Sequence, residues 1–484
     1  MRNDEGEWKG VFTRIHRYVR SRVEWLGLVL LAVAVAEASE DTFLDDLQER
    51  TLRWFLDFSA PPYGLTLDRA PHENGFSSVA AVGFALTSYA VGVERGWLSR
   101  ASAVERTLTT LRFFDRSPQS EHRSNTTGYR GFYYHFIDPE TGFRYRQVEL
   151  STIDTALLMA GVLFAGEYYQ SSDPEEQEIR QLAERLYRRV DWQWMQQDQG
   201  LIGHGWKPES GSLQHGYGGY NEAMLLYVLA LGSPTYPVTE NAWDQFMSTC
   251  QWGSFQGQDF VQFSPLFGHQ YSHVWIDFRQ ITDDYMREKG VDWFENARRA
   301  TLAQASYGRE NPQKWRDYGK YVWGWTACDG PFNGSFTYLG EKRRFWTYMA
   351  RGVSALELRD DGTVAPTAAG GSLPFAPDRV IPTLEYMKRH YGEDLYTPYG
   401  FVDAFNPSLD VDGLEFQHGR RVPGKGWFDD EHLGIDQGPI LLMAENHRSE
   451  LIWKVMKRSP HIRRGLRRAG FTGGWLEDVQ EPAL

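Results

Sequence analysis

The sequence predicts an all-α protein, an (α/α)6 barrel in which six helical hairpins form an inner and an outer ring. Helical periodicity dominates the chain, and helices with recognisable starts recur roughly seventy residues apart, the length of one inner helix, one outer helix and two loops. We therefore expect a single domain over residues 39–484. The six predicted starts are Ser77, Ser151, Asn221, Asp292, Ala376 and Gly438.

Local signals support each inner helix in turn. The first follows Ser77 in SSVAAVGFALTSYAVGVERGW, the second follows a capping box, S-T-I-D, at Ser151, and the third runs from Asn221 to a glycine and proline stop. The last three lie in DWFENARRATLAQASYG, APDRVIPTLEYMKRHYG and GPILLMAENHRSELIWKVM. Outer helices are visible from Pro174 and Thr239, whereas GSFTYLGEKRRFW predicts a hairpin or loop.

The amino terminus is typical of an export signal. Four arginines precede an apolar run that ends at Ala36, and small residues offer cleavage after Ala36 or Ala38. The run is shorter than the ~20 residues that cross a bilayer. We expect a signal peptide over residues 1–38, a periplasmic or secreted protein, and no integral membrane domain after cleavage. Whether Cys250 and Cys328 pair stays open, as does the oligomeric state.

Composition limits the partner. A formal net charge of -13 repels phosphate backbones, so no nucleic-acid partner is expected. Aromatic residues make up 15% of the chain, and flat amphipathic rings suit the stacking of sugar faces, although they also fill cores. A neutral glycan is therefore the favoured partner.

Three carboxylates lie at or just before predicted inner-helix starts: Asp154, Glu222 and Asp436. Inner helices of such a barrel run parallel, so these side chains are predicted to converge at one mouth. Each also has a structural explanation, as a capping box or as a charge that favours the helix dipole.

The segment LFGHQYSHVWIDFRQ carries His269, His273 and Asp277 at a spacing that would share one helix face. Two imidazoles and a carboxylate could bind zinc, but Gln270 stands where the zincin motif requires glutamate. A hydrogen-bonding sugar subsite is the favoured interpretation, with buried structural residues as the alternative. We expect no metal and no cofactor.

The chain resembles the bacterial glucoamylase-like proteins, a group that includes endo-β-1,2-glucanases and the glucoamylase-like region of cyclic β-1,2-glucan synthases. The similarity covers roughly residues 41–471 and implies an (α/α)6 barrel acting on β-glucan. It also implies that Glu222, in a Y-N-E-A motif, is the general acid. The endo-β-1,2-glucanases of this group carry a D-x-x-E-T-A pattern. This chain departs from it, because Ser151 stands at the position of the aspartate and Asp154 at the position of the glutamate. The motifs are GFYYHFIDPETGFRY, ELSTIDTALLMAGVL, GYNEAMLLYVLALGSP, LFGHQYSHVWIDFR, NPQKWRDYGKYVWGWTACDGP, DGTVAPTAAGGSLPFAP, YGFVDAFNPS and GIDQGPILLMAENHRS.

These observations predict an exported glycoside hydrolase that cleaves β-linked glucan by acid/base catalysis with inversion of the anomeric centre. The favoured substrate is β-1,2-glucan or its oligosaccharides. Glu222 is the predicted acid and Asp154 the preferred base. A transglycosylase, a polysaccharide lyase and a non-catalytic glycan-binding protein are the alternatives; linkage and exo or endo action stay open. Rival bases are Asp277, Asp329, Asp403 and Asp436, and candidate subsite residues are His135, Tyr220, Trp275, Arg279, Trp325 and Trp427.

Overall fold

A computed structural model describes residues 40–71 and 75–477, so the predicted signal peptide lies outside the described residues. Two compact units divide the chain between Leu47 and Gln48. Residues 40–47, the described part of the first unit, are helical, and the elements below belong to the second. No helix within the described ranges is long and apolar enough to cross a membrane. Cys250 and Cys328 are free thiols.

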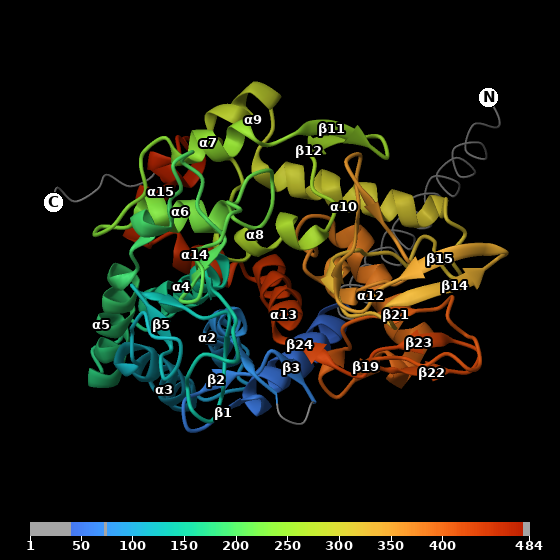
Figure 1. Cartoon of the computed structure of the whole chain (residues 1–484), viewed down its shortest axis with the longest axis horizontal. Helices are drawn as coiled ribbons and strands as arrows, with labels where there is room; N and C mark the ends of the chain where they lie inside the picture. The colour runs from blue at the N-terminus through green and yellow to red at the C-terminus, as the bar shows by residue number, and fades with distance from the viewer. Residues whose placement is uncertain (1–39, 72–74, 478–484) are drawn as a thin grey trace, which may run out of the picture. The chain divides into compact units, whose positions relative to one another are not determined.

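One group of helices is buried along most of its length because small and apolar residues cover every face. Helix α2 packs against α4 and α13, and α6 packs against α4 and α8. Helices α8 and α11 both pack against α13, and a hydrogen bond from Gln270 to Ala368 joins the α8 and α11 regions. Figure 1 shows α2 and α13, from opposite ends of the chain, side by side. These helices are α2 (Val79–Glu94), α4 (Thr152–Tyr168), α6 (Met224–Gly232), α8 (Tyr271–Trp275), α11 (Pro366–Gly370) and α13 (Gly434–Arg448).

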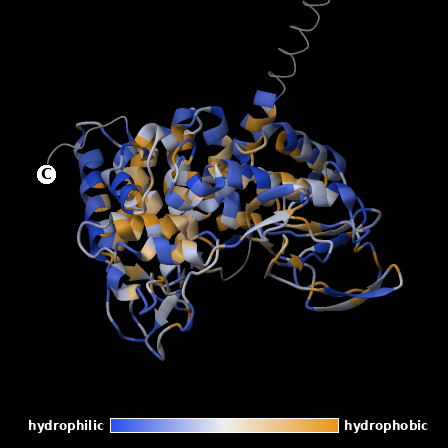
Figure 2. Ribbon diagram, turned by 90° about the horizontal axis from the view of Figure 1, so that it is seen from above, coloured by the Kyte–Doolittle hydropathy of each residue, from blue (hydrophilic) through white to orange (hydrophobic). Residues whose placement is uncertain are grey.

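A second group of helices is amphipathic. Helix α5, for example, buries Ile179, Leu182 and Leu186 on one stripe. In Figure 2 the hydrophobic colour gathers on helices in the interior and hydrophilic colour on the outer ones. This group contains α3 (Arg100–Arg116), α5 (Pro174–Arg189), α10 (Trp293–Glu310) and α12 (Pro377–Tyr391), and shorter helices are α7 (Ala242–Ser248), α9 (Asp284–Lys289), α14 (Leu451–Met456) and α15 (Pro460–Arg468).

Two helices that the sequence predicts to be inner helices are less buried than this prediction requires. The helices at Asp292 and Ala376 form, as α10 and α12, but both keep an exposed polar face. The helices buried on all faces in these parts of the chain are α8 and α11, each of five residues. Five residues are too few for a hydrophobic period to be visible in sequence. The last of the predicted inner helices, α13, begins at Gly434 rather than near Gly438, so Pro439 lies inside it and Asp436 in its first turn.

Side-chain caps explain where several helices begin. The Ser78 hydroxyl accepts a hydrogen bond from the Ala81 amide, and the Ser151 hydroxyl accepts one from the Asp154 amide at 3.2 Å. Before α6, the Asn221 side-chain oxygen accepts from the Ala223 amide at 2.9 Å. Glu222 therefore lies in a capped turn, just outside the helix that the sequence predicts to include it.

The protein is helical, as predicted, but its loops also contain short strands that the all-α prediction did not include. The predicted hairpin forms from β14 (Gly334–Tyr338) and β15 (Glu341–Phe345), and β11 (Trp252–Phe255) pairs with β12 (Gln258–Val261). Most other strands have two residues and pair loop to loop: β1 (Ser59–Ala60), β2 (Leu65–Thr66), β3 (Arg69–Ala70), β4 (Ser77–Ser78), β5 (Gly128–Tyr129), β6 (Phe132–Tyr133), β7 (Phe136–Ile137), β8 (Leu150–Ser151), β9 (Gly205–Lys207), β10 (Gly211–Ser212), β13 (Ala327–Cys328), β16 (Met349–Ala350), β17 (Gly352–Val353), β18 (Leu358–Arg359), β19 (Tyr396–Thr397), β20 (Gly400–Phe401), β21 (Phe405–Asn406), β22 (Arg420–Val422), β23 (Gly426–Phe428) and β24 (His432–Leu433).

Three of these pairings bring distant loops to the starts of buried helices. Strand β24, just before α13, pairs with β3, so that Leu433 lies opposite Arg69. Strand β4, before α2, pairs with β7 beside His135, and β8, before α4, pairs with β9. The polar residues of these loops are therefore held next to the helix starts.

Candidate active site

The starts of α4 and α6 place two acidic side chains near each other. Asp154 lies in the first turn of α4, and Glu222 in the turn that precedes α6. Burial raises the pKa of Glu222 from 4.5 to about 7; a backbone hydrogen bond opposes this rise, and the negative charge of Asp154 adds to it. Burial thus outweighs the stabilising effect of the helix start, and Glu222 holds a proton near neutral pH.

Asp154 belongs to a hydrogen-bonded group with His135, Glu149 and Ser151. The Ser151 hydroxyl donates a short hydrogen bond to Asp154, and the two ring nitrogens of His135 lie 2.9 Å from Glu149 Oε1 and 3.6 Å from Asp154 Oδ2. Burial alone would lower the pKa of His135, but the carboxylates of Asp154 and Glu149 outweigh it and raise this pKa to about 9. At neutral pH the Asp154 carboxylate therefore faces an imidazolium ion.

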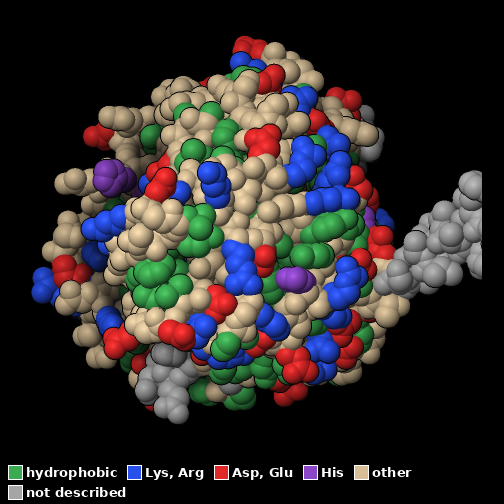
Figure 3. All heavy atoms as spheres, turned by 90° about the vertical axis from the view of Figure 1, so that its right-hand side faces the viewer, with side chains coloured by type: hydrophobic (Ala, Val, Ile, Leu, Met, Phe, Trp, Pro, Cys, Tyr) green, Lys and Arg blue, Asp and Glu red, His purple; other side chains and the backbone are tan. Residues whose placement is uncertain are grey.

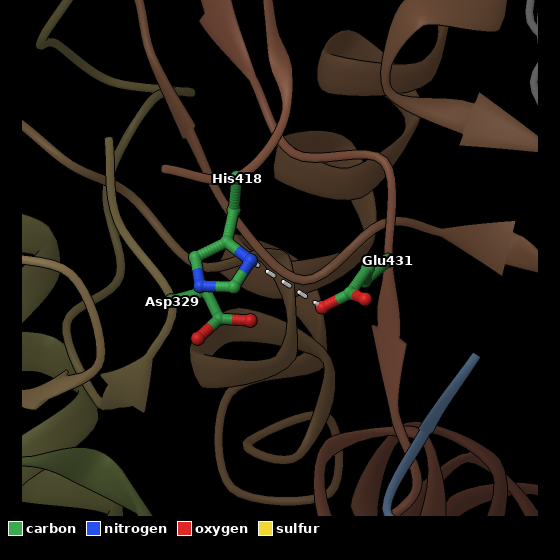
Figure 4. Close-up of side chains that lie close together, drawn as sticks. All are labelled: Asp329, His418 and Glu431. Carbon is green, nitrogen blue, oxygen red and sulfur yellow. Dashed lines mark ion pairs between the residues drawn. The ribbon is translucent and has the colours of Figure 1, made fainter. Parts of the chain in front are cut away.

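A second acidic cluster surrounds Arg69. Its Nη1 lies 2.7 Å from Asp329 Oδ2 and 3.0 Å from Glu431 Oε2, and its Nε donates to Asp68 Oδ2 at 3.3 Å. Figure 4 shows Asp329 and Glu431 on either side of His418, whose Nδ1 is 3.8 Å from Glu431. Burial raises the pKa of Asp68 to about 6, although the charges of Arg69 and His135 lower it. Because His135 acts on Asp68, the two groups of polar residues are close enough to interact.

Asp403 and Asp436 extend this cluster towards α13. Asp403 Oδ2 accepts a hydrogen bond from the Asp329 amide at 2.7 Å, and the Asp403 and Asp436 carboxyls lie within hydrogen-bonding reach of each other. Burial and then the charge of Asp329 raise the pKa of Asp403 to about 7. Burial raises the pKa of Tyr271 well above its usual value, and the charges of Asp436 and Glu222 both add to the rise. Tyr271 thus lies within the influence of both acidic groups.

The structure brings the polar side chains of six predicted site residues together in this region, and the other predicted residues have different partners. Asp277 is bound instead to Arg279 and Lys457, with oxygen to nitrogen distances of 2.7 and 2.5 Å, and the Arg279 guanidinium lies 4.4 Å from the ring centre of Trp453. Asp277 and Arg279 therefore form a structural ion pair. The six residues brought together are His135, Asp154, Glu222, Asp329, Asp403 and Asp436.

The predicted sugar or metal face at His269 and His273 does not form. A helix does not extend across these residues: His269 ends the 3-10 helix η2 (Leu266–His269), and α8 stops at Trp275. Both imidazoles are fully buried, and burial lowers the pKa of each, to about 4 for His269 and about 3 for His273. The alternative of buried structural residues fits these positions better.

The remaining predicted subsite residues are part of the core. Gln270 donates to the Ala368 carbonyl at 2.8 Å, and Tyr220 stacks on Trp293 with ring centres 5.1 Å apart. Three predicted tryptophans are fully buried with internal partners, so no ring face is available to a sugar. The Trp275 indole nitrogen donates to the Thr87 hydroxyl at 3.0 Å. The Trp325 nitrogen donates to the Tyr318 hydroxyl at 3.1 Å, and the Trp427 nitrogen donates to the His418 carbonyl at 2.8 Å.

Several site residues have no signal in the sequence. Arg69 lies on the two-residue strand β3 and Asp68 just before it, far from the recognised motifs, and the pairing of β3 with β24 brings them to α13. Tyr348 is 51% exposed, yet its pKa is raised by desolvation and by the charges of Asp436 and Asp68. Its side chain is therefore both exposed and close enough to these carboxylates to be influenced by their charge. Other residues that sequence reasoning missed are Glu149, Tyr217, Tyr271, His418, Asp429 and Glu431.

The chain is similar in sequence and structure to proteins named as glycan-degrading enzymes. The glycoamylase family model, described as "Putative glucoamylase", matches residues 214–460. The exo β-1,2-glucooligosaccharide sophorohydrolase (non-reducing end) of Parabacteroides distasonis is 26% identical over 463 residues, covering 89% of this chain, and the chain spans 58% of that relative's length. A crystal structure of a "putative glucoamylase" from Bacteroides uniformis is similar with a TM-score of 0.76 and 29% identity, over 90% of this chain and 99% of that one. The β-1,2-glucanase structure from P. distasonis is similar with a TM-score of 0.75 and 26% identity, over 89% and 60%.

Proposed function

The chain belongs to the glycoamylase family, and we propose that it is a glycoside hydrolase that cleaves β-1,2-linked glucan or its oligosaccharides. The observation that carries this proposal is the pair Glu222 and Asp154. One carboxyl keeps its proton to about pH 7, while its neighbour faces the cationic ring of His135. Two carboxyls whose environments differ in this way suit the acid and base roles of glycoside hydrolysis. The similar β-1,2-glucan enzymes support the substrate class.

The same proposal includes the predicted (α/α)6 barrel. The buried helices would form its inner ring in the order α2, α4, α6, α8, α11 and α13, and the packing of α13 against α2 would close it. The contact between the α8 and α11 regions is supported by the Gln270 hydrogen bond to Ala368. The amphipathic helices α3, α5, α10 and α12 would belong to the outer ring because each buries one stripe.

In the proposed mechanism Glu222 donates its proton to the glycosidic oxygen as the bond to the anomeric carbon breaks. Asp154 takes a proton from water, and the water oxygen forms the new bond to that carbon with inversion. The His135 imidazolium and the Ser151 hydroxyl would hold the Asp154 carboxylate in a fixed orientation. Each hydrolysis leaves Glu222 deprotonated and Asp154 protonated, and exchange with solvent restores both.

A neutral oligosaccharide suits the surroundings of this pair. Carboxylates and the Arg69 guanidinium offer acceptors and donors for sugar hydroxyls, and the exposed ring of Tyr348 suits stacking on a sugar face. On the face in Figure 3, Lys and Arg side chains are intermixed with Asp and Glu, without the single-sign stripe that a polyanion would require.

The substrate assignment is tested by incubating the purified protein with β-1,2-, β-1,3-, β-1,4- and β-1,6-glucans and separating the products by chromatography. We expect shorter oligosaccharides from the β-1,2-glucan alone, and inversion of the anomer in proton NMR of the fresh product. Products longer than the substrate would instead assign transglycosylation, and an unsaturated product that absorbs in the ultraviolet would assign a lyase.

The pH profile tests the role of Glu222. A general acid works only while protonated, and its pKa is raised from 4.5 to about 7. We therefore expect kcat/KM to stay high up to about pH 7 and then to fall about tenfold per pH unit. An ordinary carboxyl in this role would cause the same fall from about pH 4.5. A profile that declines already above pH 5 would contradict the assignment.

We also propose that the protein is exported, on the basis of the basic and apolar segments of residues 1–38. Amino-terminal sequencing of the protein from a Gram-negative host should find a chain that begins after Ala36 or Ala38. An intact amino terminus in the cytoplasmic fraction would contradict export.

A further inference from the structure

Three buried carboxylates lie close together next to the proposed active site, and Arg69 pairs with one of them, Asp329. Asp329, Asp403 and Asp429 are exposed over 0, 1 and 3% of their surfaces. One carboxylate oxygen from each lies within 4.8 Å of those of the other two. In each residue, one oxygen is buried and, among residues 40–71 and 75–477, is bound by no hydrogen-bond donor: Oδ1 of Asp329, Oδ1 of Asp403 and Oδ2 of Asp429. Buried, unpaired carboxylate oxygens are costly unless a cation or a proton neutralises them.

The second oxygen of each carboxylate is fixed by the protein. Asp329 Oδ2 binds Arg69 at 2.7 Å, Asp403 Oδ2 accepts from the Asp329 amide at 2.7 Å, and Asp429 Oδ1 accepts from the Asp430 amide at 2.8 Å. One oxygen therefore orients each carboxylate, and among the described residues no donor is bound to the other; the Asp403 carboxyl also lies within hydrogen-bonding reach of Asp436. This is the arrangement of a preorganised ligand set, in which supporting hydrogen bonds orient the metal ligands.

Backbone hydrogen bonds also tie the three loops together. The Asp403 amide donates to the Glu431 carbonyl at 3.0 Å, and the Asp429 amide donates to the Ala404 carbonyl at 3.0 Å. The three residues follow or lie between short strands: Asp329 after β13, Asp403 between β20 and β21, and Asp429 after β23. An ion bound by all three would join these loops beside α13.

A neighbouring trio serves as an internal comparison. Asp329, His418 and Glu431 also cluster closely, as Figure 4 shows, but there the Arg69 guanidinium already bridges Asp329 and Glu431. Within the described part of the chain, neither Asp403 nor Asp429 accepts a hydrogen bond from an arginine; their fixed oxygens accept from backbone amides. In the trio with Asp403 and Asp429, Arg69 pairs with Asp329 alone, so a bound cation would supply the charge that the other two carboxylates lack.

We propose that Asp329, Asp403 and Asp429 form a Ca²⁺ site. All three ligands are carboxylate oxygens, the donors that hard cations prefer, and neither imidazole nor thiolate is present to favour zinc. Ca²⁺ binds oxygen at about 2.3–2.6 Å, so oxygens on opposite sides of one ion are up to about 5 Å apart, in agreement with the spacing of this trio. The ion would stabilise the loops that carry part of the substrate site, without taking part in the acid and base steps.

The test is isothermal titration of the full-length protein, stripped with EDTA, with CaCl₂, together with thermal melts in EDTA and in Ca²⁺. We expect one saturable Ca²⁺ site per chain, a higher melting temperature in Ca²⁺, and weaker binding of Mg²⁺, which demands a stricter octahedral geometry. Absence of saturable heat and an unchanged melting temperature in millimolar Ca²⁺ would overturn the site and would mean that protons neutralise the cluster. This wild-type measurement requires no variant and no substrate, so it is independent of the proposed hydrolase activity.

A matched pair of variants locates the ion. Asp429→Asn should weaken Ca²⁺ binding at least about tenfold, because it removes a charged ligand. Glu431→Gln also removes one negative charge from this region, but Glu431 belongs to the neighbouring trio and not to the proposed Ca²⁺ ligands. This variant should therefore retain most of the Ca²⁺ affinity. Equal weakening in the two variants would contradict a specific site. If Asp429→Asn fails to fold, Asp403→Asn replaces it.

Discussion

Glu222→Gln is expected to lower kcat on β-1,2-glucan by about 10² to 10⁴ while leaving KM and the melting temperature almost unchanged. The amide has the size of the acid and is neutral, and the pKa of about 7 means that Glu222 is itself largely neutral at pH 6. The substitution therefore removes the proton donor with little change in local charge. Steady-state kinetics at pH 6 with a thermal melt of the same sample measure both effects.

The leaving group distinguishes an acid from a structural residue. A β-glucoside with an activated phenolate leaving group requires little protonation, so Glu222→Gln should retain much more of its rate on that substrate than on glucan. Asp154→Asn is the control, because loss of the base should slow both substrates alike. Near-normal turnover of glucan by Glu222→Gln, with a lowered melting temperature, would show that Glu222 only supports the start of α6.

Arg351→Met is expected to destabilise the protein by about 3–5 kcal/mol, because it leaves a buried carboxylate without its partner. Arg351 and Asp361 are both fully buried, and two guanidinium nitrogens donate to Asp361 at 2.8 and 2.9 Å. Arg351 also donates to the backbone carbonyls of Cys328 and Trp346 at 2.8 and 2.9 Å. The residue thus joins the loop that carries Asp329 to the hairpin beside it. Urea unfolding measures the change in the free energy of unfolding.

An exposed ion pair is the matched control. Arg53 lies 3.8 Å from Glu49, and the two side chains are 50% and 51% exposed. Arg53→Met removes the same kind of group, but water screens the charge that remains, so less than about 1 kcal/mol should be lost. Combining Arg351→Met with Asp361→Asn should recover part of the stability, because no buried charge is then left unpaired. Equal losses for Arg351→Met and Arg53→Met would contradict the importance of burial.

Helix starts were predictable because they depend on neighbouring residues. The capping box at Ser151 forms, Asp292 caps α10, and the segment around GSFTYLGEKRRFW is a hairpin. The spacing of buried and exposed residues was less informative where a helix is short. Helices α8 and α11 are buried on every face over only five residues, so the sequence pattern favours the longer amphipathic helices at Asp292 and Ala376 as buried helices instead.

The sequence alone determined the helical character of this protein and the acidic residues at the starts of α4, α6 and α13, because caps, periodicity and motifs are local properties. Tertiary structure decided which polar residues surround them. Asp68 and Arg69 reach α13 through a two-residue strand pairing, and Asp277 is neutralised by Lys457, far from it in the chain. Burial and ionisation depend on the atoms that folding brings around a side chain. The raised pKa of Glu222 and the buried tryptophans therefore follow only from the packed structure.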